Sequence, residues 1–552
     1  MRRDPLLRTK PNRHGWREAA LVCLAFTTLT VLLTFPLALR LGSVGRADNG
    51  DGQFSIWNVA WVARTLVVDP LHVFDANIFY PHRWTLAYSE TNLGAGGLAI
   101  PVYWATRNPY AAHNFVLLVS FVLSGAATYY LVRYLAADRR AAVVAGICFA
   151  FCPYVFAHTP HIHLLMTAGL PLSLLAFHRL ADRPSPRRGV VLGLAMGAQA
   201  LFCGYYAIFV MLMIGYFVML IAAVRRRWAD APYWSAVATA AVVAIAVALP
   251  IYLPYVAHQR STGFSRSLND ADLYSASWRT YLASGSYAHT WLLQLIGGAP
   301  DALFPGFLAT TFGLAGLGMG WRGRGRPAEI SLLYGTLAGL ACWASLGPRA
   351  GLYRVLYATV PAFTLLRAPV RIGVVVVLAV SVLAGAAIAA LLARRSWSTL
   401  AALALTLAAV AELMVPVRFP PVPAVETAHL VLAALPWGPV IELPVFSPQF
   451  AYARAQYMLS STTHWMPLVD AYSDYIPEDF ANNASVLGGF PSLASFKLLE
   501  RDRVRYAIFH LERYGPDIRQ ALGTRMNEFA PYLRRRYEDD RTSLYEIVGF
   551  PP

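Results

Sequence analysis

The sequence predicts a polytopic α-helical membrane protein of about eleven transmembrane helices, followed by a small C-terminal α/β domain outside the membrane. Three observations predict this fold class. The chain of 552 residues is 57% hydrophobic and only 14% charged, with a mean hydropathy of +0.46. Its apolar runs are about 20 residues long, the length that crosses the hydrocarbon core of a bilayer. From about residue 420 onward, short strand-like runs alternate with helical stretches instead.

The positive charge of the chain is concentrated in its hydrophobic part. Residues 1–416 hold 33 Lys/Arg against 15 Asp/Glu, whereas residues 417–552 hold 13 against 15. Charge that lies between apolar runs orients helices in a membrane. The sequence shows no basic face interleaved with aromatic side chains, so we expect no nucleic-acid partner. The five cysteines lie in apolar runs and predict no disulfide framework.

The first predicted element is a retained transmembrane helix. A basic segment, residues 1–17, holds six Lys/Arg and precedes an uncharged run at 19–39. This run is too long for a typical signal-peptide core, and no small-residue cleavage site follows it. We therefore expect a cytoplasmic N-terminus and a transmembrane domain over residues 18–416.

Ten further apolar runs complete the predicted transmembrane domain. They lie at about 111–132, 141–157, 162–178, 189–204, 205–224, 233–256, 303–321, 328–346, 369–393 and 397–415. Arginine clusters follow the second, fourth, sixth, eighth and tenth of the eleven spans. With a cytoplasmic N-terminus, every cluster falls on the cytoplasmic side, as the positive-inside rule requires. The odd number of spans then places the tail, residues 417–552, on the extracytoplasmic side.

Two long connections are predicted on that outer side, and the tail follows them. The first connection, residues 41–110, contains a helical stretch at 54–68 that we expect along the membrane surface. The second covers about 257–302. In the tail, strand-like runs occur at 440–443, 504–510 and 543–548, with helical patterns at 492–501 and 516–522.

A short acidic, glycine-rich segment follows the first span, Asp48-Asn49-Gly50-Asp51-Gly52. The two glycines allow a sharp turn and leave little bulk near the Asp51 carboxylate. A carboxylate near the bilayer surface, partly shielded by aromatic side chains, is suited to accept a proton from an attacking hydroxyl or amine. A solvated turn, or a calcium-like cluster of oxygen ligands, is the alternative interpretation.

The chain resembles the bacterial GT-C superfamily of integral-membrane glycosyltransferases. The resemblance rests on the topology and on five segments, which read GDGQFSIWNVAW at 50–61, FYP at 79–81, FAFCPYVFAHTPHIHLL at 149–165, LLRAPVRIGVVVVLA at 365–379 and YMLSSTTHWMPLVDAYSDYIP at 457–477. It implies a bacterial plasma-membrane enzyme that transfers a hexose or pentose from a polyprenyl-phosphate or pyrophosphate carrier. Transfer would occur on the external face with inversion at the anomeric carbon. The acceptor stays open between a protein, a glycan and a lipid.

The resemblance also implies a first-loop Asp or Glu as the general base. That role maps onto Asp51, with Asp48 as the alternative, because the acidic pair of better-studied members is often adjacent and is here split by two residues. The leaving lipid phosphate needs charge neutralisation rather than a strong acid, and arginine supplies it with two planar hydrogen bonds. Arg367 and Arg371 lie four apart before the tenth span and are the candidates, with Arg260 next. Helix anchoring or an ion pair to the tail is the structural alternative for them.

Three histidines cluster at the external turn between the third and fourth spans, at His158, His161 and His163. A divalent metal site, contact with the donor phosphate, and simple packing all stay open. No other cofactor is indicated. Asp75 is either part of an acceptor pocket or a turn cap. His464 lies in a tail segment, with Tyr472 and Asp474, whose side chains suit sugar binding or domain packing.

Two other functions fit a chain of this composition. A transporter or flippase of lipid-linked intermediates would need ionisable side chains at mid-span depth and inverted repeats. A non-catalytic membrane scaffold that presents the tail would tolerate loss of both Asp48 and Asp51.

Overall fold

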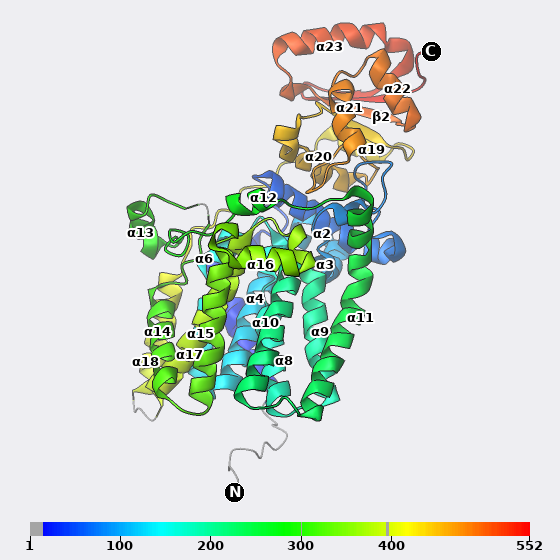
Figure 1. Cartoon of the computed structure of the whole chain (residues 1–552). Helices are drawn as coiled ribbons and strands as arrows, with labels where there is room; N and C mark the ends of the chain where they lie inside the picture. The colour runs from blue at the N-terminus through cyan, green and yellow to red at the C-terminus, as the bar shows by residue number, and fades with distance from the viewer. Residues whose placement is uncertain (1–14, 300, 394–396) are drawn as a thin grey trace.

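The computed structural model describes residues 15–299, 301–393 and 397–552. Residues 1–14 of the basic N-terminal segment therefore lie outside the described residues. Long helices run side by side in a bundle, and a small sheet with its own helices lies beyond one end of that bundle (Figure 1). The predicted helical part and a small C-terminal domain with strands are both confirmed.

Helices form at each of the eleven apolar ranges. Their bounds are α1 Gly15–Leu33, α4 Pro109–Ala136, α5 Arg139–Ala150, α6 Pro153–Ala157, α7 Ile162–Leu165, α8 Gly169–Asp182, α9 Pro186–Phe202, α10 Gly204–Val224, α11 Ala231–Thr262, α14 Phe307–Arg322, α15 Arg326–Ser345, α17 Gly373–Leu392 and α18 Ser398–Glu412. The third and fourth ranges are each broken into a longer and a shorter helix. Pro153 occupies the first helical position of α6, where its missing N–H leaves no helical bond unmade.

Seven helical stretches among the described residues are long and apolar enough to cross a membrane. They are Gly15–Leu33, Pro109–Ala136, Arg139–Ala157, Ile162–Asp182, Gly204–Val224, Ala231–Thr262 and Pro369–Leu392. Of the remaining four predicted ranges, α9, α14 and α18 are shorter than these, with 17, 16 and 15 residues.

The connection after α1 is folded and buried rather than spread as a surface helix. Its main helices are α2, Gly50–Val68, and α3, Leu93–Thr106. The α2 helix packs against α3, α4 and α20 (Ala455–Ser460), and most of its residues are buried, including Trp57 and Asn58. The sequence predicted that residues 54–68 lie along the membrane surface. In the structure, other helices of the protein cover this segment instead. The second connection contains α12, Leu268–Leu273, and α13, Thr290–Leu295.

The C-terminal domain is built on a four-stranded sheet in the order β1-β2-β4-β3. The strands are β1 Val440–Leu443, β2 Tyr506–His510, β3 Leu533–Glu538 and β4 Thr542–Ile547; the main helices around them are α19 Thr427–Ala433, α20, α21 Glu478–Gly488, α22 Leu493–Arg501 and α23 Pro516–Glu528. β1 and β2 are parallel, and the other pairs are antiparallel. The three predicted strands are confirmed to within two residues. The edge strand β3 was not predicted, because its LRRRYE sequence exposes most of its side chains.

The first connection and the C-terminal domain share one hydrophobic core. Trp57, Trp61 and Phe79 from the connection pack in the same cluster as Ile441 and Ile508 of the sheet. Full burial of a large apolar side chain stabilises a fold by roughly 1.5–3 kcal/mol. This shared core therefore holds the tail over the N-terminal end of α2.

Backbone hydrogen bonds fix the same register. The Tyr80 amide donates to the Leu468 carbonyl at 2.8 Å, and the Leu468 amide donates to the Asn77 carbonyl at 3.0 Å. The Asn77 side chain also donates to Met466 O at 3.1 Å and accepts from the Trp57 indole at 3.1 Å. The tail segment that follows, residues 469–474, is thereby brought to the start of α2.

Candidate active site

Asp51 lies in the first turn of α2, and the residues around it explain its position. The Asn49 side chain caps the helix by accepting the Gly52 amide at 2.8 Å. A Cβ added at Gly52 would lie 1.6 Å from the Arg46 carbonyl oxygen, and one at Gly50 would lie 2.7 Å from that of Tyr452. The two glycines are thus required by close backbone approach, and they hold the carboxylate at a helix N-terminus, where negative charge is favoured.

The Asp51 carboxylate has a neighbour on each oxygen. His161 Nε2 lies 3.3 Å from Oδ2, and the Tyr472 hydroxyl donates to Oδ1 at 3.3 Å. Contact with His161 holds the pKa of Asp51 below its usual value; burial acts in the opposite direction, and Tyr472 and Arg367 add to the lowering. Asp51 is therefore ionised at neutral pH and is able to accept a proton.

Asp48 has a different environment. The Arg46 guanidinium lies 3.1 Å from its carboxylate and also donates to the Thr159 hydroxyl at 2.7 Å. Asp48 is not among the residues that line the pocket at Asp51. Of the two carboxylates that the sequence offered as the base, only Asp51 faces this pocket.

The pocket has an empty space of about 540 Å³, part of it open to solvent. Its walls come from the first connection, the turn between α6 and α8, the start of α10, the segment before α17 and the tail. The lining residues are Asp51, Phe54, Ser55, Ser89, Glu90, His161, His163, Tyr205, Arg367, Arg371, Tyr472, Ser473 and Asp474. Five of the residues predicted from the sequence therefore meet here: Asp51, His161, His163, Arg367 and Arg371.

The two arginines line the same pocket as the Asp51 carboxylate and make few contacts with other charged groups. The Arg367 guanidinium is 3.7 Å from the Asp474 carboxylate and 4.9 Å from the centre of the Tyr274 ring. The Arg371 guanidinium lies 4.5 Å from the centre of the Tyr205 ring. Within the described ranges, no carboxylate lies within ion-pair distance of Arg371. Both guanidinium groups keep donors for an anion in the pocket.

The three histidines of the turn separate into two environments. His161 and His163 line the pocket, and the ring centre of His161 lies 6.0 Å from each of the other two. His158 lies behind the wall, with Nδ1 2.8 Å from the Tyr154 carbonyl oxygen and Nε2 3.6 Å from Asp301. Burial lowers the pKa of His158 to about 3.

The other three predicted residues lie outside the pocket. Arg260 is exposed in the last turn of α11. The Asp75 carboxylate accepts the Trp84 amide at 2.8 Å, which is the turn-cap arrangement. His464 lies in the C-terminal domain, with Nε2 3.4 Å from His429 Nδ1.

Glu90 and Tyr205 are among the lining residues that sequence reasoning did not place in the site. Both oxygens of Glu90 accept the Gly204 amide, at 3.1 Å each, and burial raises the pKa of this carboxyl group. The sequence offered little indication of Glu90, which is one acidic residue in a connection rich in aromatic side chains. Tyr472 and Asp474 were noted as part of a sugar-binding type of segment, and Asp474 also pairs with Arg266 at 2.9 Å.

Apolar space lies next to this polar pocket. An adjoining pocket of about 800 Å³ shares Ser89, Glu90, Tyr205 and Asp474 with it; its further lining includes Ile208, Tyr252, Tyr255, Phe264, Leu365 and Leu366. A third pocket of about 690 Å³ is almost wholly apolar; its lining includes Phe209, Leu212, Leu337, Leu356 and Val375. A long apolar chain can thus lie beside the polar pocket.

The chain is similar to known glycosyltransferases in part of its sequence and in its fold. The sequence model of the dolichyl-phosphate-mannose-protein mannosyltransferase family matches residues 107–252, about a quarter of the chain. The structure superposes on the arabinofuranosyltransferase AftD from Mycobacteria with a TM-score of 0.55 and 15% identity, over 98% of this chain and 40% of AftD. The chain has the GT-C fold.

Two further structures match with lower TM-scores. ArnT from Cupriavidus metallidurans matches at 15% identity in the apo state and at 14% when bound to undecaprenyl phosphate, with TM-scores of 0.48 and 0.47. These matches cover 97% and 98% of this chain and 99% and 100% of ArnT. No curated protein sequence matches the chain. This chain spans about two fifths of the length of AftD.

Proposed function

We propose that this protein is an inverting glycosyltransferase that moves a sugar from a polyprenyl-phosphate carrier to an acceptor, with Asp51 as the general base. The observation that carries the proposal is the pocket itself. The ionised Asp51 carboxylate shares this pocket with Arg367 and Arg371, whose guanidinium groups have free hydrogen-bond donors. An apolar pocket adjoins it. This combination suits a substrate with a sugar, a phosphate and a long hydrocarbon chain.

The reaction needs one proton acceptor and one anion site. The acceptor hydroxyl attacks the anomeric carbon from the face opposite the phosphate, and Asp51 takes its proton as the new C–O bond forms. The bond to the phosphate oxygen breaks with its electron pair, so the carrier phosphate leaves with an additional negative charge. Positioned general bases of this kind contribute about 10²–10⁴-fold in rate.

Arg367 and Arg371 are the groups proposed to stabilise that departing charge. Guanidinium groups match phosphate oxygens in planar, charge-assisted pairs. His161 and His163 line the same space, and contact with His161 lowers the pKa of Asp51. The apolar pocket beside Glu90 and Tyr205 is proposed for the first isoprene units, with the pocket between α10, α15 and α17 as an extension.

The proposed topology follows the charge distribution. We propose eleven spans and a cytoplasmic N-terminus, with the Asp51 pocket and the domain from residue 417 on the extracytoplasmic face of a bacterial plasma membrane. In this arrangement the tail covers the pocket and contributes to the choice of acceptor.

The experiment is a transfer assay with two donors. Proteoliposomes containing the purified chain receive polyprenyl-phosphate-linked mannose or arabinose together with a bacterial cell-envelope extract as acceptor. Release of polyprenyl phosphate, with label appearing in the extract, is expected for one donor and is expected to be lost in Asp51→Asn. Movement of donor across the bilayer without release of polyprenyl phosphate would instead favour the transporter interpretation. Equal release by the wild-type and Asp51→Asn proteins would exclude the proposed base.

A further inference from the structure

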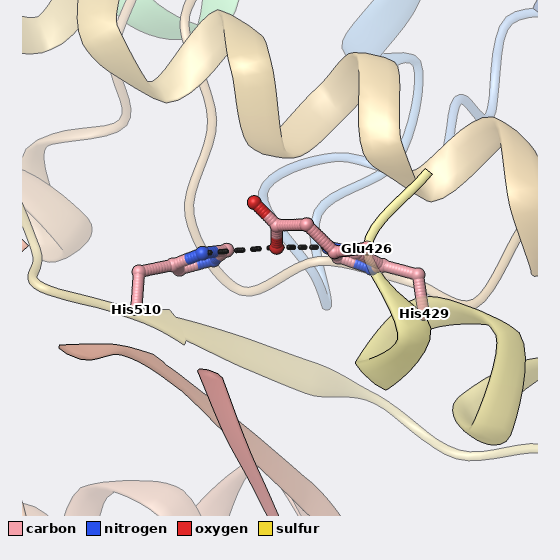
Figure 2. A group of neighbouring side chains, drawn as sticks. All are labelled: Glu426, His429 and His510. Carbon is pink, nitrogen blue, oxygen red and sulfur yellow. Dashed lines mark ion pairs between the residues drawn. The ribbon is translucent and has the colours of Figure 1, made fainter. Parts of the chain in front are cut away.

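A second group of histidines and carboxylates lies in the C-terminal domain, away from the Asp51 pocket. Glu426 precedes α19, His429 is on α19, and His510 ends β2 (Figure 2). Glu426 Oε2 lies 3.2 Å from His510 Nδ1 and 3.6 Å from His429 Nε2. The three atoms all lie within 4.8 Å of one another.

These groups are buried without the hydrogen bonds that burial normally demands. His429 and His510 are 0% and 2% exposed. Glu426 Oε2 lies within ion-pair distance of His429 Nε2 and His510 Nδ1, yet none of the three atoms makes a hydrogen bond within the part of the chain that the structure describes. A buried polar atom without a hydrogen bond costs about 1–3 kcal/mol. Three such atoms that converge on one point indicate a shared partner at that point.

The two separations from Glu426 Oε2 fit a tetrahedral metal ion. Bonds of about 2.0–2.1 Å from zinc to imidazole nitrogen and carboxylate oxygen, at tetrahedral angles, put ligand atoms about 3.3–3.4 Å apart. The separations of 3.2 Å and 3.6 Å bracket this value. The Glu426 side chain is 22% exposed, so its side of the cluster has room for a water molecule as the fourth ligand.

A second carboxylate orients one of the ligands. Glu442, in β1, is fully buried, and its Oε2 lies 2.7 Å from His510 Nε2. When the Nδ1 lone pair of His510 is directed at a metal, Nε2 carries the proton and donates it to Glu442. This carboxylate–histidine–metal order is the usual outer arrangement of zinc ligands.

We propose that Glu426, His429 and His510 bind one divalent cation, with Zn²⁺ as the best match, and that Glu442 positions His510. The donor set of two imidazoles and one carboxylate suits zinc rather than calcium or magnesium, which prefer oxygen ligands. The ion joins α19 to the far end of β2, two elements about 80 residues apart in the sequence, and thereby stabilises the domain that covers the pocket.

A second set, His429 with Glu442 and His464, meets the same spacing limit. His464 Nε2, however, lies 3.4 Å from His429 Nδ1, the ring nitrogen that does not face Glu426, and Glu442 Oε2 is occupied by His510. His464 is therefore assigned as a neighbour of the site and not as a ligand.

The test measures metal on the full chain. Protein purified in detergent is treated with a chelator, equilibrated with Zn²⁺, desalted and analysed by mass spectrometry of its metal content. We expect about one zinc per wild-type chain and at least a tenfold lower content in His429→Gln and His510→Gln. His464→Gln and the matched control His72→Gln, an exposed histidine paired with Asp69, are expected to keep the metal.

A second readout needs no variant. Co²⁺ added to the chelated wild-type protein is expected to give the intense visible absorption of tetrahedral cobalt, and Zn²⁺ is expected to remove it. Wild-type protein that holds no more zinc than His429→Gln, or that gives no cobalt band, would overturn the proposal. Loss of zinc in His464→Gln with retention in His510→Gln would overturn the ligand set.

Discussion

The Asp51 pocket and the Glu426 cluster both combine carboxylates with histidines, but they differ in exposure to solvent. The Glu426 cluster consists of Glu426, His429, His510 and Glu442. At the pocket, the Asp51 side chain is 46% exposed and faces arginines that retain free donors. In the cluster, His429 and Glu442 are fully buried, and each group faces another member of the cluster. Both sites contain a carboxylate beside a histidine, so this pair alone does not mark a catalytic site. The Asp51 pocket differs in that its carboxylate is exposed and its arginines have free hydrogen-bond donors.

The largest effect is expected from removing the exposed carboxylate, which tests whether the Asp51 pocket is the catalytic site. Asp51→Asn keeps the shape and removes the proton acceptor, so we expect the rate of transfer to fall about 10²–10⁴-fold. Asp48→Asn is the matched control, because Asp48 pairs with Arg46 outside the pocket, and it is expected to change the rate less than threefold, roughly the effect of a surface ion pair. A comparable loss in both variants would place the base elsewhere.

The arginines are expected to have the next largest effect. Arg371→Gln removes a charge that has no carboxylate partner among the described residues, so the loss falls on the substrate phosphate. A hydrogen bond to a charged group contributes about 1.5–3 kcal/mol, which corresponds to about 10–150-fold in kcat/KM. Initial rates at varied donor concentration measure it, and Arg371→Lys should recover part of the loss. An unchanged kcat/KM in Arg371→Gln would show that the guanidinium only packs on Tyr205.

Tyr472→Phe tests the contribution of the tail to the pocket. The variant loses the single hydroxyl that donates to Asp51 Oδ1. A net hydrogen bond is worth about 0.5–1.5 kcal/mol, so kcat should fall about 2–13-fold. Steady-state assays on protein of matched thermal stability would measure this, and a kcat equal to that of wild type would mean that the tail does not act on the base.

The smallest expected effect is on pH dependence. The base acts when it is deprotonated, so activity is lost as the pH falls through the pKa of Asp51. His161 holds that pKa below its usual value. His161→Gln should therefore raise it and move the acid limb of kcat/KM toward higher pH, by about one unit or less. A limb that stays in place or moves to lower pH would contradict the assigned interaction.

Local sequence signals predicted one half of the pocket and could not predict the other. Asp51, His161 and Arg367 each stand in a segment whose glycines, prolines or spacing mark a turn beside an apolar run. Their meeting point depends on contacts that no local pattern encodes. Tyr472 reaches Asp51 across 421 residues, and Glu90 reaches the pocket through its bond to the Gly204 amide.

Local sequence patterns also could not predict all of the fold or the Glu426 cluster. Strands β1, β2 and β4 were visible as apolar runs, whereas β3 exposes Arg534–Arg536 and resembles a loop. The pairing of Glu442 with His510 follows from the parallel register of β1 and β2, in which Glu442 lies opposite Ile508. A sequence that places these two residues 68 positions apart gives no sign that they meet.

The hydroxyl that Tyr472 extends to Asp51 also has a consequence for biosynthesis. Tyr472 follows every long helix of the bundle in the chain, so a nascent chain contains the whole bundle before it contains this wall of the pocket. The pocket around Asp51 is therefore completed last, when the segment that carries Tyr472 packs against the start of α2.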